Sequence, residues 1–404
     1  MGSRGGAVPH PGGRLLLVLL ASLVGGALLV GCTSTASGGQ AARESAPPPT
    51  TEAPKPAELT LSVAQDATDV EPGQPFTADV ANGTITEASL IGADDTVVAG
   101  GMRPDGSGWK STEPLGYGKT YTLTATATGE DGEAVTATST FTTATPSRQV
   151  SVWINAQDGE EVGVGMPLIF TFSGSIADRA AAEKALRITT EPEVEGAFHW
   201  FGDEQVIWRP KEYWPSGTKI SIDAEIYGKH LGEGTYGLED NAVDITVGDK
   251  LIAVADGGTH QMRVLVNDEE VKTMPLSMGK PSSSTPNGHY TVMSEHVGYT
   301  MDSSTYGVPV DSGDGYETWV QYAVRLSNSG IFYHSAPWSV GNQGHSNVSH
   351  GCINLSTENA AWLMETSKRG DIVTVQNAGE QTLEPTDGWS VWQMSWDDWR
   401  SGGA

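Results

Sequence analysis

The sequence predicts a mainly β protein: two tandem immunoglobulin-like β-sandwiches, then a β-rich domain with one main helix and a short Trp-rich C-terminal extension. Three observations support this fold class. The 404 residues exceed the usual length of one domain. Short segments of alternating apolar and polar residues recur along the chain. A faint repeat spans its middle. The predicted segments are 1–31 (signal peptide), 32–56 (tether), 57–148 and 149–249 (sandwiches), 250–376 (third domain) and 377–404 (C-terminal extension).

The N-terminal segment predicts export and membrane attachment. Arginines precede an apolar run from Leu15 to Val30, which is typical of a secretory signal. The run ends in Leu-Val-Gly-Cys32, which resembles the lipobox of bacterial lipoproteins, whose cysteine is lipidated and becomes the first mature residue. We therefore expect a lipid on Cys32 and a protein anchored on the extracytoplasmic face of the cell membrane; an uncleaved spanning anchor is the alternative. The Pro/Ser/Thr-rich tether cannot bury enough apolar area to order itself.

The repeat identifies the two sandwiches. The segments around Pro75 and Trp109 recur around Pro167 and Trp208, about 90 to 100 residues later, which is roughly the length of one small sandwich. Local patterns predict a β-hairpin from residues 121–127 and 134–141 around an Asp-Gly turn, and one short helix over 177–186. The sandwiches are interpreted as wall or carbohydrate adhesion modules or as spacers, and the lack of an aromatic ladder favours spacers.

The third domain concentrates the chemistry, because it contains six of the nine histidines and the second cysteine. Its alternation and apolar runs predict strands at 251–255, 261–266, 290–293, 321–324 and 372–375, and a helix at 356–367. The charge balance excludes most nucleic-acid functions: 23 Lys+Arg stand against 50 Asp+Glu, a net charge of −27, which repels a polyanion.

Cys352 is the candidate nucleophile. Two cysteines, Cys32 and Cys352, are too few for a disulfide framework. A free thiol that is retained beside histidines in an exported protein indicates a chemical function for that thiol. A nearby imidazole can take the thiol proton and leave a thiolate–imidazolium pair. Backbone N–H groups at Gly351-Cys352 are candidate oxyanion donors. His350 is one candidate for the base, because residues two apart share a face in an extended segment. His334 is the other candidate, and spacing alone leaves both possible.

Two other interpretations of Cys352 are weaker. Zinc binding with His334, His345 and His350 matches no common ligand spacing, so neither a metal nor another cofactor is expected. An inert buried cysteine needs an apolar pocket, and the small polar neighbours in sequence argue against one.

The run Ser349-His350-Gly351-Cys352-Ile353-Asn354, preceded by His334, resembles the signature of the L,D-transpeptidase catalytic domain, the YkuD family. Segments 284–288, 301–309 and 334–341 resemble its actinobacterial branch. In that branch a lipoprotein-like N-terminus and immunoglobulin-like domains precede the catalytic domain. The resemblance covers almost all of residues 57–404 and is weakest in the first sandwich.

The resemblance implies an acyltransferase of the cell wall. In this family the cysteine attacks the carbonyl that links the third residue of a peptidoglycan tetrapeptide donor stem to its terminal D-alanine. The side-chain amine of an acceptor stem then attacks the thioester and gives a 3→3 cross-link. Carbapenem-type inhibitors are expected to acylate the same thiol. The alternatives are an L,D-carboxypeptidase, in which water replaces the acceptor amine, and a non-catalytic wall-binding structural lipoprotein.

Carried over residue by residue, the resemblance makes Cys352 the nucleophile and His334 the general base. Ser335 orients the imidazole through its carbonyl or its hydroxyl. The residues expected to bind substrate, with the first three on a lid over the cleft, are Tyr306, Tyr316, Trp338, Ser349, His350, Gly351 and Asn354.

The C-terminal extension carries four tryptophans at helix-like spacings, Trp389, Trp392, Trp396 and Trp399. Neighbouring aspartates argue against binding to an anionic membrane surface. We therefore predict that these side chains pack on the catalytic domain, rather than stacking on glycans or lying on a membrane.

Overall fold

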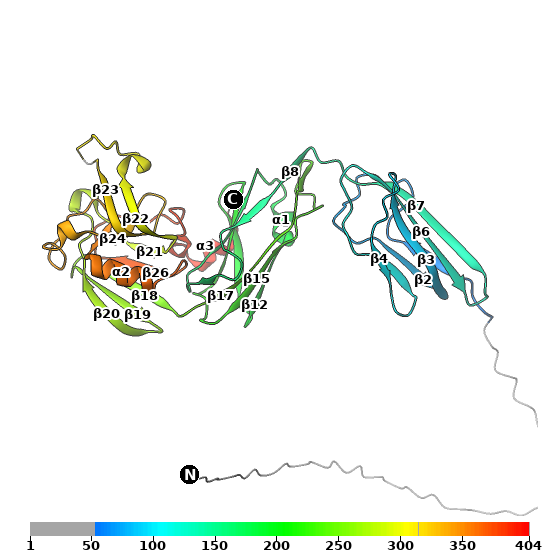
Figure 1. Cartoon of the computed structure of the whole chain (residues 1–404), viewed down its shortest axis with the longest axis horizontal. Coiled ribbons are helices and arrows are strands. Elements are labelled where there is room, and N and C mark those ends of the chain that lie inside the picture. Colours follow the sequence, from blue (N-terminus) through cyan, green and yellow to red (C-terminus); the bar gives the residue numbers. More distant parts are fainter. Residues whose placement is uncertain (1–52, 314, 404) are drawn as a thin grey trace, which may run out of the picture. The chain divides into compact units, whose positions relative to one another are not determined.

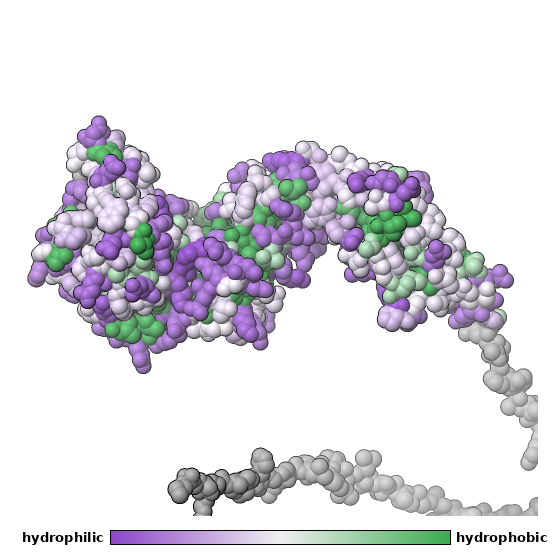
Figure 2. Space-filling model, in the orientation of Figure 1, coloured by the Kyte–Doolittle hydropathy of each residue, from purple (hydrophilic) through white to green (hydrophobic). Residues whose placement is uncertain are grey.

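The computed structural model describes residues 53–313 and 315–403, so the predicted signal peptide, Cys32 and most of the tether lie outside the described residues. The fold is mainly β, as predicted (Figure 1). No helix among the described residues is long and apolar enough to cross a membrane. On the face drawn in Figure 2, hydrophobic residues gather in separate patches rather than in one continuous surface.

The first sandwich pairs a sheet of order β1-β2-β5-β4 with a sheet of order β3-β6-β7. The predicted hairpin is β6–β7, and it is confirmed by their antiparallel register. Its core packs Phe76, Leu90, Trp109 and Phe141 between the sheets. The strands are β1 (Glu58–Leu61), β2 (Thr77–Ala81), β3 (Gly83–Gly92), β4 (Gly100–Met102), β5 (Gly108–Ser111), β6 (Thr120–Gly129) and β7 (Ala134–Thr142).

The second sandwich pairs sheets of order β13-β14-β11-β9 and β10-β17-β15-β12. The short helix predicted here is α1 (Arg179–Ala185), which begins where the Asp178 carboxylate accepts the Ala181 N–H. The strands are β8 (Arg148–Val150), β9 (Val152–Ile154), β10 (Glu161–Val162), β11 (Leu168–Phe172), β12 (Leu186–Glu191), β13 (Gly196–Trp200), β14 (Gln205–Pro210), β15 (Lys219–Ala224), β16 (Thr235–Gly237) and β17 (Asn241–Val247).

The sequence repeat corresponds to one sheet that occurs in both sandwiches. The order β1-β2-β5-β4 matches β9-β11-β14-β13 strand for strand. Trp109 on β5 and Trp208 on β14 each cover a glycine of the neighbouring strand: a Cβ on Gly100 would lie 2.0 Å from the Trp109 ring, and one on Gly196 would lie 1.9 Å from the Trp208 ring. The repeated tryptophan therefore needs a repeated glycine.

The third domain consists of two sheets, β20-β19-β18-β26-β21 and β22-β23-β24-β25, with α2 packed on the second (Figure 1). The predicted helix is α2 (Thr357–Thr366), capped by the Ser356 hydroxyl. All five predicted strands are present, whereas β20, β22, β24 and β25 were not predicted. The strands are β18 (Leu251–Asp256), β19 (Gln261–Val266), β20 (Glu269–Pro275), β21 (Gly288–Thr291), β22 (Ser294–Asp302), β23 (Glu317–Arg325), β24 (Phe332–Ser335), β25 (Ile353–Leu355) and β26 (Ile372–Gln376), with 3-10 turns η1 (Pro281–Ser283), η2 (Ser303–Tyr306) and η3 (Pro337–Ser339).

The C-terminal extension, with η4 (Val391–Gln393) and α3 (Trp396–Arg400), packs mainly on the second sandwich. The buried Trp399 ring stacks on His199 with centroids 4.9 Å apart, and its Nε1–H donates to the Ala197 carbonyl at 2.8 Å. The Arg209 guanidinium lies 4.6 Å from the centroid of the same ring. The prediction that the tryptophans pack on the third domain was therefore wrong for most of this contact, because their partners on β13 and β14 are distant in sequence.

Charged pairs join the second sandwich to the third domain. Arg369 binds Glu160 at 2.8 Å, and Lys368 binds Glu161 at 2.5 Å. Asp371, fully buried beside them, accepts the Lys368 N–H, and its Oδ1 has no hydrogen-bond partner among the described residues. Burial raises the pKa of Asp371 to about 8. Burial therefore favours the protonated form of the Asp371 carboxyl group.

Candidate active site

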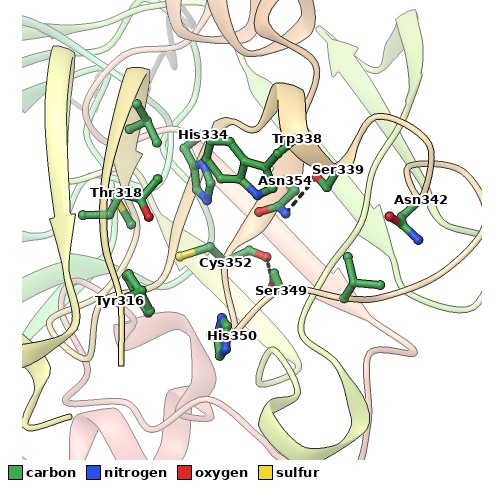
Figure 3. Close-up of a pocket in the computed structure, with 13 residues that line it drawn as sticks. Tyr316, Thr318, His334, Trp338, Ser339, Asn342, Ser349, His350, Cys352 and Asn354 are labelled. Atoms are coloured by element: carbon green, nitrogen blue, oxygen red, sulfur yellow. Dashed lines mark hydrogen bonds between the residues drawn. The ribbon is translucent and has the colours of Figure 1, made fainter. Parts of the chain in front are cut away.

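A cavity of about 350 Å³ lies beside Cys352, between strands β22 and β23 on one side and the segment from η3 to β25 on the other (Figure 3). Trp338, which lines the cavity, is 58% exposed to solvent. Its lining residues are Met301, Tyr316, Thr318, Val320, His334, Trp338, Ser339, Asn342, Val348, Ser349, His350, Cys352 and Asn354.

Cys352 immediately precedes β25 and is 7% exposed. Its neighbours include Met301, Val320 and Phe332, from β22, β23 and β24. The expectation that polar neighbours exclude an apolar pocket was therefore wrong, since the pocket is assembled from strands remote in sequence. Burial raises the pKa of the Cys352 thiol to about 11, although the Phe332 backbone opposes the shift. The thiol donates a hydrogen bond to the Gly330 carbonyl at 3.4 Å.

His334 is a buried side chain on β24, in the same cavity as Cys352. Its Nδ1 lies 3.0 Å from the Ser335 carbonyl oxygen, so Nδ1–H donates and Nε2 is left as the basic nitrogen. Burial lowers the pKa of His334 despite this hydrogen bond. Burial therefore opposes formation of the two charged members of the thiolate–imidazolium pair expected from the sequence.

Ser335 orients the imidazole through its carbonyl. Its hydroxyl serves a different purpose, because it accepts the backbone N–H groups of Gln321 and Tyr322 at 3.1 and 3.2 Å. These bonds tie β24 to β23. Of the two contacts expected for Ser335, the structure therefore has the one between its carbonyl and the imidazole.

The loop before the nucleophile is held by side-chain hydroxyls. Ser349 Oγ–H donates to the Cys352 carbonyl at 2.6 Å, and the same oxygen accepts the Gly351 N–H at 3.1 Å. Thr285 Oγ1–H donates to the Gly351 carbonyl at 2.6 Å. The Gly351 N–H, expected as an oxyanion donor, is thus engaged by Ser349. Gly351 has φ +130°, which favours glycine at this position.

The two competing histidines lie on opposite sides of Cys352 (Figure 3). His350 is exposed and packs against Tyr316, with ring centroids 5.5 Å apart. His334 packs against Trp338, with centroids 6.0 Å apart. Both imidazoles therefore reach the cavity. His334 is buried and its Nδ1 is hydrogen-bonded to a carbonyl, whereas the His350 side chain is exposed.

The remaining predicted residues divide between the cavity and its support. Asn354 lines the cavity, pairs with His334 across β24 and β25, and donates from Nδ2 to Ser339 Oγ at 3.0 Å. Tyr306 does not line the cavity. Its ring packs over Gly330, and its hydroxyl accepts a hydrogen bond from Arg325 at 3.2 Å.

Several lining residues were missed by the sequence analysis. The alternation of β23 places Thr318 and Val320 on the cavity side, and that signal is readable in the sequence once the strand is recognised. No local signal marks the others, which are Met301, Ser339, Asn342 and Val348. Among the described residues, no three His, Cys, Asp or Glu side chains lie close enough to hold a metal ion.

Comparison with known protein families and relatives assigns the domains of the chain. A model described as a bacterial Ig domain matches residues 67–230, and one described as an L,D-transpeptidase catalytic domain, YkuD, matches residues 250–375. L,D-transpeptidase 2 of Mycobacterium tuberculosis is 45% identical over 347 residues, covering 86% of this chain and 85% of the relative. L,D-transpeptidase 5 of the same species is 36% identical and covers 86% and 77%.

Among solved structures, the L,D-transpeptidase LdtMt1 in complex with imipenem is similar to the C-terminal part of the molecule. It is 40% identical and covers 57% of this chain and 100% of that one, with a TM-score of 0.50. The buried cysteine and histidine therefore lie within a domain whose sequence relatives are L,D-transpeptidases over most of their length. The chain belongs to the L,D-transpeptidase family.

Proposed function

We propose that this protein cross-links peptidoglycan stems through a thioester on Cys352. One observation carries the proposal: Cys352 and His334, with its Nε2 available as a base, line one cavity of an L,D-transpeptidase catalytic domain. The substrate class is the tetrapeptide stem. No cofactor is needed, because the reaction moves only protons and an acyl group.

In the first half-reaction, His334 Nε2 takes the proton of Cys352 as Sγ attacks the carbonyl carbon that precedes the terminal D-alanine. The carbon–nitrogen bond breaks, and the imidazolium returns the proton to the leaving D-alanine amine. The Ser335 carbonyl stabilises the imidazolium through Nδ1–H. Because burial raises the pKa of the Cys352 thiol, we propose that proton transfer and attack occur together.

In the second half-reaction, the side-chain amine of the third residue of an acceptor stem attacks the thioester. The new amide is the 3→3 cross-link, and the thiol regains its proton through His334. Apolar lining from Met301, Val320 and Tyr316 keeps water from the thioester and favours the amine over hydrolysis. Water as the acceptor defines the L,D-carboxypeptidase alternative.

The test uses purified protein and tetrapeptide-stem fragments, with products identified by mass spectrometry. We expect free D-alanine and 3→3 dimers from the wild type and neither from Cys352→Ala. Tripeptide without dimers supports the carboxypeptidase instead. No turnover by a folded wild type supports a non-catalytic wall-binding structural lipoprotein.

A carbapenem provides an independent probe of the same thiol. Imipenem is bound in the structure of the relative LdtMt1, and we propose that this chain is acylated by carbapenems on Cys352. One inhibitor equivalent should be found on the peptide that contains Cys352. An equal adduct on Cys352→Ala would contradict the assignment.

We further propose that the enzyme acts outside the cytoplasm, anchored to the cell membrane by a lipid on Cys32. The support is the lipobox-like tetrapeptide that ends at this residue. Two or three acyl chains hold a protein firmly, whereas one binds weakly. Wild type should partition into detergent and begin at residue 32, and Cys32→Ser should yield uncleaved or mis-sorted precursor. An intact Met1 on the wild-type envelope protein would refute the cleavage.

A further inference from the structure

The turn between β23 and β24 holds the nucleophile in place. In this turn, residues 326–331, the Gly330 carbonyl accepts the hydrogen bond from the Cys352 thiol at 3.4 Å. The turn is closed by the Leu326 N–H to the Ile331 carbonyl at 2.9 Å and by the Ile331 N–H to Ser327 Oγ at 3.1 Å. The Cys352 thiol is therefore hydrogen-bonded directly to this turn.

On the side of Tyr306, the turn is held at Gly330. Its φ of +93° favours glycine, and a Cβ there would lie 2.6 Å from the Tyr306 ring. Tyr306 is in turn held by Arg325, whose guanidinium donates to its hydroxyl at 3.2 Å and lies 4.8 Å from the Phe332 ring centroid. The Tyr306 ring, held by Arg325, therefore packs directly against Gly330.

The opposite side of the turn is fixed by the C-terminal extension. Asp387 Oδ1 accepts the Ser329 N–H at 2.8 Å, and its Oδ2 accepts the Ser329 hydroxyl proton. Gly388 lies against the same turn, since a Cβ there would be 3.1 Å from the Ser327 Cα. Asp387 is 58 residues from Ser329 in sequence, and both of its carboxylate oxygens are used on this one residue.

We propose that Asp387 is a positioning residue for the acylation step: by clamping Ser329 it fixes the neighbouring Gly330 carbonyl and thereby the Cys352 thiol. The inference rests on the proposed function of Cys352 as the nucleophile. Charge-assisted hydrogen bonds to a carboxylate are stronger than neutral ones, which suits a clamp on Ser329, an exposed residue of the turn. A reacting atom displaced by about 1 Å can lose about a hundredfold in rate, so a partial loosening is expected to be measurable.

The experiment compares acylation of full-length variants by a carbapenem, with the binding constant and the acylation rate constant measured separately. Asp387→Ala removes both hydrogen bonds to Ser329 and should lower the acylation rate constant about tenfold, with the binding constant unchanged. Ser329→Ala removes only the hydrogen bond from the Ser329 hydroxyl, and Asp387→Asn retains one acceptor for the Ser329 N–H. Both should fall between Asp387→Ala and wild type. Asp397→Asn, an exposed acid of α3, is the matched control and should acylate like wild type.

A second readout separates positioning from general loss of structure. Alkylation of Cys352 by iodoacetamide requires no bound geometry, so its rate in Asp387→Ala should change by less than about twofold while acylation falls. Acylation of Asp387→Ala at the wild-type rate overturns the proposal. An equal loss in Ser329→Ala and Asp387→Ala, or a parallel change in alkylation and melting temperature, also overturns it. A wild type that is not acylated at Cys352 contradicts the proposed function instead.

Discussion

The protonation state of Cys352 can be tested by the pH dependence of its alkylation. Met301, Val320 and Phe332 surround the thiol, and burial raises its pKa to about 11. A pH of 7 is about four units below this pKa. The thiolate then makes up about 1 in 10,000 of the molecules, and deprotonating the thiol costs about 5 kcal/mol. Because the pKa lies above the working range, each added pH unit should increase the thiolate about tenfold.

The assay is the rate of iodoacetamide modification of Cys352 between pH 7 and 10, followed by mass spectrometry. The logarithm of the rate should rise with a slope near one and without a plateau. Carbapenem acylation should behave differently. Burial lowers the pKa of His334 below its usual value, so the imidazole is already the neutral base above neutral pH and the rate should be nearly flat there. An alkylation plateau below about pH 8 would show a resting thiolate–imidazolium pair and refute this account.

Three further predictions concern other residues. His334→Ala should slow carbapenem acylation by about a hundredfold, against a milder effect of His350→Ala and none of the exposed control His345→Ala; stopped-flow fluorescence measures all three, and a larger loss in His350→Ala would reverse the assignment of the base. Trp399→Ala empties a fully buried site and should lower the unfolding free energy by about 3 to 5 kcal/mol in chemical denaturation, whereas a neutral effect would contradict the docking of the extension. Asp371 has a raised pKa, so its stability penalty is absent below the usual pKa of 3.8 and grows as pH rises to about 8; Asp371→Asn should therefore raise the melting temperature at pH 8 but not at pH 4, and an equal effect at both would refute it.

Local patterns made much of the fold predictable. The hairpin β6–β7 follows from strict alternation around an Asp-Gly turn, and α2 follows from the Ser356 cap and one apolar face. The pairing of Tyr333, His334 and Ser335 with β25 is parallel and long-range, so no periodicity reveals it. The resemblance around Cys352 nevertheless named both His334 and Cys352, which line one cavity.

Contacts between distant segments could not be predicted in the same way. Most of the tryptophan contact was assigned to the wrong surface, because Arg209 and His199, which contact Trp399, lie about 190 and 200 residues earlier. The apolar pocket of Cys352 was missed for the same reason, as its walls come from three other strands. The clamp between Asp387 and Ser329 likewise joins two segments that carry no local motif.

The central claim is that Cys352 is acylated by the donor stem with loss of D-alanine. The most direct measurement is the intact mass of the protein, quenched rapidly in acid after mixing with a tetrapeptide donor and no acceptor. The account predicts a mass increase equal to the donor minus D-alanine, located on the peptide that contains Cys352 and absent from Cys352→Ala. D-alanine release by Cys352→Ala at the wild-type rate, or an adduct on any other residue, would contradict it.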